Sequence, residues 1–400
     1  MTKNKQNVPQ VRFKGFTDDW EQRGLGECFD ERAERSAEGE LIAVTINSGV
    51  VKASELNRHD NSSEDKSNYK VVRKNDIAYN SMRMWQGASG YSQYDGILSP
   101  AYTVAIPKEN IDSVFFSYLF KCTDMIYQFQ INSQGLTSDT WNLKFPAFSK
   151  IKVNVPKLEE QSQIGSYFHT LDHLITLHQR KCETLQKLKK SMLQKMFPKN
   201  GSHFPEIRFK GFTDAWELRE LGEVFVQTSN YVNPKEDNIE LWSLTVEEGL
   251  VPKTERYTRD FLVKKEDKFK EVRTGDIVYN PMNMTLGAIG YNNTPKSIAV
   301  SGYYVTMVAN SNTDPYFINT WLKSPQAILT YKNYATGSLK EKQRIQFPTL
   351  SIISVPFPKL EEQQQIGTYF RNLDHLITLH QRKLETLKKL KKAMLQKMFI

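Results

Sequence analysis

The sequence predicts an α+β protein with two similar α/β modules, each followed by one long helix. The two helices are expected to form an antiparallel coiled coil with pseudo-two-fold symmetry that separates the modules. Residues 157–197 and 359–399 are identical at 34 of 41 positions, and shorter matching stretches precede each of them. The order is therefore module, helix, module, helix, with predicted segments at 1–156, 157–197, 198–358 and 359–400.

The first module mixes short strand signals with one helical stretch. β-Branched and aromatic runs bounded by Gly, Pro and Asn indicate strands at 41–44, 77–80, 102–106 and 151–155. Residues 114–129 favour a helix, as do residues 316–332 in the second module, and the polar run 57–68 indicates a loop. Residues 12–18 return at 208–214, so the second module repeats the first.

Each long segment predicts one helix of roughly 60 Å. Apolar residues alternate four and three positions apart, which is the pattern of a coiled-coil seam. Like seams pair most simply by a two-fold axis, which makes two helices antiparallel. The predicted seam residues are Ile164, Phe168, Leu171, Ile175, His178 and Leu185, and in the second helix Ile366, Phe370, Leu373, Ile377, His380 and Leu387.

The composition argues against several classes of protein. No run of about 18 apolar residues is present, and the first residues lack the apolar stretch of a signal peptide, so we expect a cytoplasmic protein. Three scattered cysteines argue against a disulfide framework and a zinc site. The net charge of +9 suggests nucleic acid, but the modules carry 0 and +1 whereas the helices carry +3 and +5. Charge alone therefore does not make the modules DNA-binding.

The helices are more alike than a seam requires. Identical positions include outward polar residues such as Thr176, Gln179, Arg180 and Thr184. Binding of two copies of one partner, one by each helix, explains this identity. Recent duplication is the alternative, but the modules should then match equally well, and they do not.

One stretch of the modules shows the opposite pattern. Between residues 76 and 91 and between 276 and 291, Asn80, Met82 and Met84 are the same in both copies. In an extended segment the alternate positions form the other face, and these differ between the modules. Arg suits guanine, Asn suits adenine and Trp can stack or wedge, although a drifting solvent-exposed face is the alternative. The candidate DNA-binding residues are Ser81, Arg83, Trp85, Gln86, Asn283 and Thr285.

A second variable loop precedes the Phe-Pro pair of each module. Hydroxyl and basic residues in such a loop suit phosphate contacts, although an ordinary polar loop has the same composition. The candidates are Thr137 and Ser138 in the first module, and Ser338, Lys340, Lys342 and Arg344 in the second.

No motif for catalysis is present in the sequence. A phosphate-binding G-x-x-x-x-G-K-[ST] loop and a dinucleotide fingerprint are both missing. His169 and His173 have the spacing of metal ligands on a helix, but Arg371 replaces the first of them in the second copy. We therefore predict no catalytic residue, no metal site and no cofactor in this chain.

Taken together, these features resemble the specificity subunit of type I restriction-modification enzymes. The resemblance covers the whole chain and is strongest in the helices, which open Pro-x-Leu-Glu-Glu-Gln-x-x-Ile and close Lys-x-x-Met-Leu-Gln-Lys-Met-Phe. It implies two target recognition domains that each read half of a split site in double-stranded DNA. The helices would set the gap and dock two methyltransferase (M) subunits, with restriction-translocase (R) subunits joining for cleavage.

The same resemblance implies that cofactors belong to the partners. The methyltransferase would use S-adenosylmethionine, and the restriction subunit would use ATP and Mg. The near-neutral modules depart from the expectation for DNA-binding domains, so the helices or partners would supply much of the phosphate attraction. The alternatives are a free-standing DNA-binding regulator that dimerises through its coiled coil, and an enzyme with diverged motifs.

Overall fold

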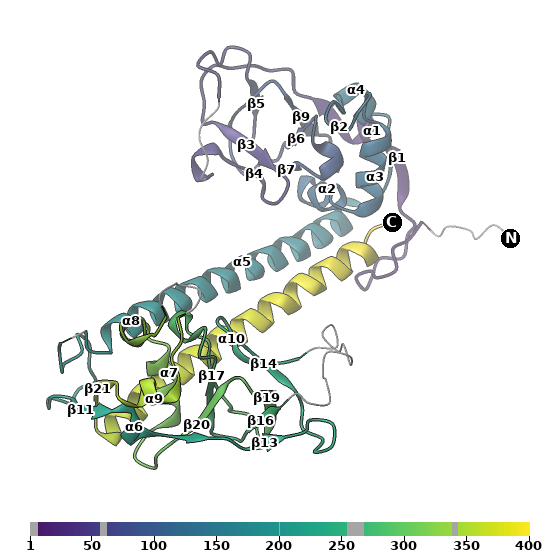
Figure 1. Cartoon of the computed structure of the whole chain (residues 1–400). Helices are drawn as coiled ribbons and strands as arrows, with labels where there is room; N and C mark the ends of the chain where they lie inside the picture. Colours follow the sequence, from purple (N-terminus) through teal and green to yellow (C-terminus); the bar gives the residue numbers. More distant parts are fainter. Residues whose placement is uncertain (1–6, 57–61, 200, 254–267, 338–342) are drawn as a thin grey trace. The chain divides into compact units, whose positions relative to one another are not determined.

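The computed structural model describes residues 7–56, 62–199, 201–253, 268–337 and 343–400. The chain divides into two compact units. The first comprises Met1–Gln179 with Arg382–Ile400, and the second comprises Arg180–Gln381. Each unit contains one module and a part of both long helices (Figure 1). The boundaries between the two units fall within the long helices. The predicted boundaries between modules and helices remain predictions.

The first module is built from short antiparallel strands. Its central sheet has the order β2-β9-β6-β7, with bounds Phe29–Glu31, Tyr102–Pro107, Ile77–Asn80 and Ser89–Tyr91. Three two-stranded sheets pair β1 with β10, β3 with β4 and β5 with β8, at Glu21–Gly24, Lys152–Val155, Ile42–Thr45, Gly49–Lys52, Lys70–Val72 and Gly96–Leu98. The four strands predicted in this module are confirmed.

The second module repeats the central sheet. Its order is β12-β20-β17-β18, at Phe225–Thr228, Val305–Ala309, Ile277–Tyr279 and Ile289–Tyr291. The remaining strands are β13, β16 and β19 in one sheet and the pairs β11–β21 and β14–β15, at Tyr231–Val232, Phe269–Val272, Ile298–Ser301, Glu217–Glu220, Ser354–Phe357, Trp242–Thr245 and Gly249–Pro252. Ile277 pairs with Met307 as Ile77 pairs with Ala105, so the register is shared.

Each predicted module helix is in fact two helices. The stretch 114–129 forms α2 (Ser113–Leu119) and α3 (Thr123–Ile131), and 316–332 forms α7 (Pro315–Leu322) and α8 (Pro325–Tyr334). In α8, Ser324 accepts a hydrogen bond from Ala327 N, and Pro325 takes the first position, which starts a new helix. The short helices are α1, α4, α6 and α9, and the 3₁₀ turns η1, η2 and η5, at Leu25–Cys28, Phe145–Phe148, Leu221–Val224, Phe347–Ser351, Ala53–Glu55, Met84–Gln86 and Met284–Leu286.

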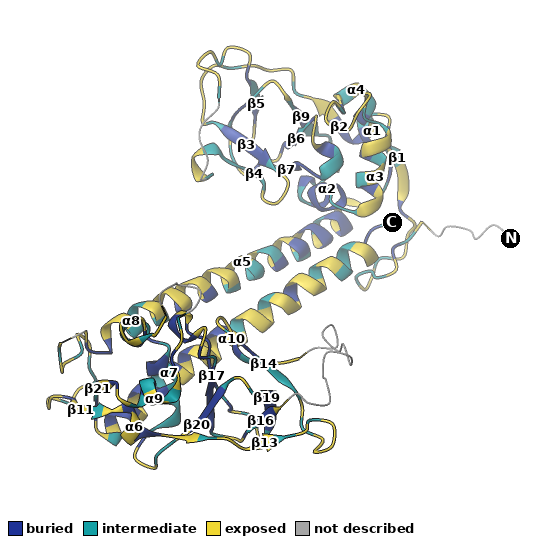
Figure 2. Cartoon of the chain, in the orientation of Figure 1, coloured by how far each residue is buried: buried dark blue, intermediate teal, exposed yellow. Residues whose placement is uncertain are grey.

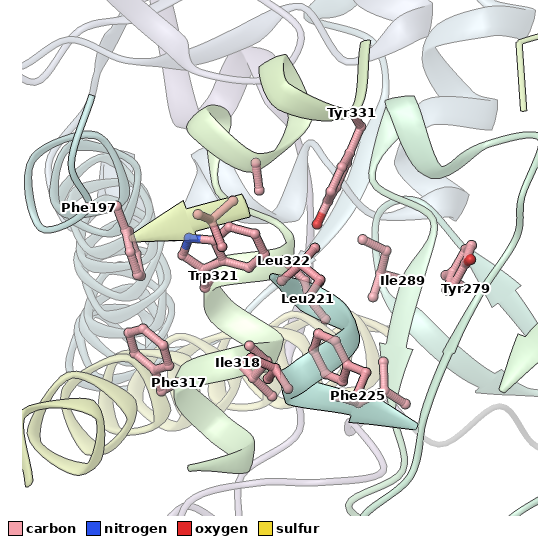
Figure 3. Close-up of a cluster of buried hydrophobic side chains, with 14 of the residues drawn as sticks. Phe197, Leu221, Phe225, Tyr279, Ile289, Phe317, Ile318, Trp321, Leu322 and Tyr331 are labelled. Carbon is pink, nitrogen blue, oxygen red and sulfur yellow. The ribbon is translucent and has the colours of Figure 1, made fainter. Parts of the chain in front are cut away.

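Aromatic side chains fill the core of each unit. In the first unit Phe29 packs edge-on against Phe116 with ring centroids 5.0 Å apart, and α2 is largely buried (Figure 2). In the second unit Phe197 lies against Phe317 with centroids 5.9 Å apart, next to Trp321 (Figure 3). Burial of such large apolar surfaces is the main stabilising contribution.

The long helices are α5 (Leu158–Lys195) and α10 (Leu360–Lys397). In the first unit Lys391 of α10 donates to Asp172 of α5 at 2.5 Å. In the second unit Lys189 of α5 donates to Asp374 of α10 at the same distance. In each unit, the early part of one helix therefore lies beside the late part of the other. The fold-class prediction of two similar α+β modules and an antiparallel helix pair is confirmed.

The seam between the long helices accounts for only part of the surface that these helices bury. Most predicted seam residues are buried, but Ile175, His178 and His380 are only half-buried. Phe168 stacks on Phe399 at 5.7 Å and also lies against Tyr118 of the module. The early part of each helix therefore belongs to a globular core and has the broader stripe of such helices.

Buried polar groups tie the start of each long helix to its module. Glu160 is 1% exposed and accepts from Nε and Nη2 of Arg12 at 2.6 and 2.7 Å. Gln161 is also buried and accepts from Asp112 N at 2.9 Å. The second unit repeats these contacts through Arg208, Glu362 and Gln363. The identity of Glu160 and Gln161 with Glu362 and Gln363 therefore has a structural cause.

Candidate nucleic-acid interface

The variable stretch of the first module is a turn rather than an extended strand. β6 ends at Asn80, whose side chain accepts from Met82 N at 3.0 Å and whose carbonyl accepts from Arg83 N. The 3₁₀ turn η2 follows and ends at Gly87, which has φ +82°. We call residues 81–87, and 281–287 in the second module, the reading turns. The prediction of alternating inner and outer faces beyond Asn80 is wrong, because a tight turn does not keep the period of a strand.

Each reading turn buries one of the candidate residues. Ser81 is buried, and its hydroxyl shares a hydrogen bond of 2.8 Å with Thr103. Thr285 is buried as well. Met82, expected inside, is 44% exposed. Ser81 and Thr285 therefore do not present their side chains to solvent as the sequence predicted.

Arg83 and Asn283 occupy equivalent exposed positions on the two reading turns. Arg83 donates to Gln86 at 3.3 Å. Within the described residues it forms no ion pair, so its guanidinium donors remain largely available. Met84 and Met284 are fully buried and anchor the reading turns in the cores of the two units. The two modules thus present different side chains from the same local structure.

Trp85 of the first reading turn meets a second tryptophan, Trp141. Trp85 and Trp141 pack edge-on with ring centroids 5.2 Å apart, and Trp85 Nε1 donates to the carbonyl of Met82 at 3.1 Å. Sequence reasoning missed Trp141. The available signal was its place directly after the variable loop, where the second module has Gln343.

The second variable loop is held against the reading turn. In the first module Gln134 and Asn142 form a two-residue bridge, and Leu143 N donates to the carbonyl of Ser81 at 2.8 Å. Thr137 and Ser138 lie exposed at the tip. The loop that carries these two candidates is therefore attached to the turn that carries Arg83.

The corresponding loop of the second module has the same attachment. Thr336 and Arg344 form the bridge, and Ile345 N donates to the carbonyl of Pro281 at 3.0 Å. Arg344 is exposed. The candidates Ser338, Lys340 and Lys342 lie outside the described residues.

A concave surface adjoins the reading turn of the first module. This cavity of about 730 Å³ is lined by Asn80, Met82 and Arg83 together with Tyr69 and Tyr102. Its walls come from β6, from the start of β9 and from the segment around β3. Arg83 therefore stands at the edge of a hollow with both polar and aromatic lining.

The described residues contain no group of three His, Cys, Asp or Glu side chains that could hold a metal ion. Burial raises the pKa of Cys28 to about 11 and that of Cys122 to about 12, so both thiols are protonated at neutral pH and are poor nucleophiles. Within the same residues, no helix is both long and apolar enough to cross a membrane.

Comparisons with known proteins agree on one family. The family model described as the type I restriction modification DNA specificity domain matches residues 17–187 and 213–389. The type I restriction enzyme MjaVIII specificity subunit of Methanocaldococcus jannaschii is 24% identical over 352 residues, which cover 81% of this chain and 78% of that protein. The MjaIX specificity subunit of the same organism is 24% identical over 307 residues, covering 73% and 69%.

One solved structure has the same fold over its full length. The S subunit of a type I restriction-modification system from M. genitalium superposes with a TM-score of 0.61 at 15% identity. The match covers 98% of this chain and 99% of that one. At this identity the likeness concerns the fold alone.

Proposed function

The chain belongs to the type I restriction-modification DNA specificity family, and from this premise we propose that it is the non-catalytic subunit that selects the DNA sequence. Each module reads one half of a bipartite target in double-stranded DNA. The complex acts in the cytoplasm, where the chain binds two methyltransferase subunits and, for cleavage, restriction-translocase subunits. The chain itself uses no cofactor. The methyltransferase uses S-adenosylmethionine, and the restriction subunit uses ATP and Mg.

The observation that carries this proposal is the difference between the reading turns. Arg83 and Asn283 stand at the same exposed position of two like modules. Arg binds guanine through two hydrogen bonds, and Asn binds adenine in the same manner. Two unlike readers on two like modules suit a target whose halves differ in sequence.

The helix surfaces support binding of two equal partners. In the first unit Leu177 of α5 is 53% exposed and Leu390 of α10 is 37% exposed. In the second unit their equivalents Leu379 and Leu188 have the same two values. The same leucines are exposed to the same extent in both units, which suits a partner that contacts each unit in the same way. We assign these leucines to the docking of one methyltransferase subunit by each unit.

The helices also suit the role of a spacer. Half-sites read from one face of a duplex lie about one helical turn apart, roughly 34–36 Å. A helix of 38 residues is about 57 Å long, so its length is sufficient to set such a gap. Residues inserted into both helices should lengthen the unspecified gap and leave both half-sites unchanged.

Co-expression with the cognate methyltransferase tests the proposal. We expect a complex with two methyltransferase subunits for each copy of this chain, and methylation of one bipartite sequence in the genome of the expressing cells. Replacing residues 1–156 by those of a relative should change one half-site only. A stable chain without partners that binds a single continuous site would favour a regulator. Methyl transfer or cleavage by the isolated chain would show that it is an enzyme.

A further inference from the structure

A lysine joins the reading turn of the first module to the β3–β4 hairpin. Lys121 follows α2, and its Nζ donates to the carbonyls of Gly87 and Ile46, the latter at 3.1 Å. Gly87 ends the reading turn, and Ile46 lies in the tight turn between β3 and β4. An ammonium has three donors, so one side chain can fix two backbone segments at once.

Gly87 is pressed against this lysine. A Cβ at Gly87 would lie 3.2 Å from Ile126 Cδ1 and 3.7 Å from Lys121 Cδ. The positive φ of Gly87 already favours glycine. The end of the reading turn therefore rests on α3 and on the stem of Lys121, and its carbonyl is held by the ammonium.

The junction that carries Lys121 also contacts the long helices. Tyr118 donates to Asp172 of α5 at 2.8 Å, and the same carboxylate receives Lys391 of α10. Cys122 Sγ lies 3.5 Å from the carbonyl of Leu395 of α10. A continuous set of contacts thus runs, within the first unit, from both long helices through residues 118–122 to the reading turn.

The second unit has a lysine at the equivalent position. Lys323 follows α7, and its Nζ lies 3.2 Å from the place that a Cβ of Gly249, the first residue of β15, would take. Gln326, at the start of α8, donates to the carbonyl of Gln194 of α5 at 2.9 Å. The second module therefore repeats the lysine beside the hairpin and a contact between the start of α8 and a long helix, without the two carbonyl contacts that Lys121 makes.

We propose that Lys121 is a positioning residue, which fixes the reading turn and the β3–β4 hairpin of the first module relative to the parts of the long helices in the same unit. The inference rests on the proposed function, since it assigns Lys121 to recognition of one half-site. The lysine does not need to touch DNA. It holds backbone segments whose displacement by an ångström would move the side chain of Arg83 out of bonding distance.

The test uses the full methyltransferase complex and compares Lys121→Met with Lys323→Met. Methionine keeps an unbranched stem and removes the donors. The measurement is the ratio of methylation rates on the cognate duplex and on duplexes with one changed base in either half-site. We expect Lys121→Met to lower this ratio about tenfold, equal to about 1.4 kcal/mol, at one half-site only. Lys323→Met, the matched control, should leave the ratio at this half-site unchanged, and Lys121→Arg should restore most of it.

Several results would overturn the inference. If Lys121→Met lowers the melting temperature or the overall rate but leaves both ratios unchanged, the lysine is merely structural. Equal loss at both half-sites has the same meaning. Should Lys121→Met fail to fold, Lys121→Gln, which keeps a donor but not the reach, replaces it with the same expectations. A wild-type complex without a bipartite target would instead refute the proposed function.

Discussion

The ion pair between Arg12 and Glu160 offers a direct test of how each module is fixed to its helix. The carboxylate is 1% exposed and the guanidinium 14%, and two hydrogen bonds join them. Arg12→Leu would leave the carboxylate buried without its partner. Removing one member of a buried pair costs about 3–5 kcal/mol. Because the guanidinium retains some contact with water, we expect the lower end of that range.

Urea denaturation followed by hydrogen exchange measures this change. The first unit should open at lower urea concentration than the second, since the equivalent pair of Arg208 and Glu362 is intact. Arg208→Leu should reverse the order. The double variant Arg12→Leu with Glu160→Leu should lose less stability than Arg12→Leu alone, because no charge is left buried. A loss below about 1 kcal/mol for Arg12→Leu, the range of surface pairs, would refute the reasoning.

Three further predictions concern recognition, assembly and pH. Arg83→Ala should weaken binding of the complex to one half-site by about 1–3 kcal/mol, and Asn283→Ala should affect only the other, as measured by competition with single-base variants. Leu177→Asp should place a charge in the proposed docking surface of the first unit, so mass measurement of the complex should show one methyltransferase subunit in place of two. Burial lowers the pKa of Lys121 to about 8, from 10.5. The unfolded chain then binds more protons between these values, so the stability of the first unit should rise with pH from about 8 towards 10, and Lys121→Met should reduce that slope.

The repeat made the fold predictable, whereas the local shape of the reading turn was not. Strands at 77–80 and 102–106 followed from composition, and the antiparallel helix pairing followed from the likeness of the two seams. The prediction of an extended strand at the reading turn failed because Asn80, Met82 and Met84, identical in both modules, looked like one face of a strand. In fact Asn80 closes a turn and Met84 anchors a 3₁₀ helix. Asn80 and Met84 are therefore retained for different structural reasons, and their spacing only resembled the two-residue repeat of a strand.

Long-range contacts explain the other differences. Nothing near Ser81 in the sequence shows that its hydroxyl meets Thr103 of the neighbouring strand. Lys121 reads as an ordinary lysine at a helix end until the carbonyls of Gly87 and Ile46 are placed beside it. The first contact depends on the pairing of β6 with β9, and the second depends on the packing of α2 against β7. Local sequence patterns specify neither.

The structure narrows what the identity of the two helices means. Glu160 and Gln161 are retained by buried contacts with the module, and Gly165 lies where a Cβ would be 3.1 Å from Phe115 N. These positions therefore need no external partner to remain alike. Leu177 and Leu188 differ from these buried positions. Both are exposed, and their equivalents in α10 are exposed to the same extent. Under the proposed docking, a partner that contacts each unit in the same way would account for those positions, so the proposal of two equal docking surfaces rests on them rather than on the overall likeness of the helices.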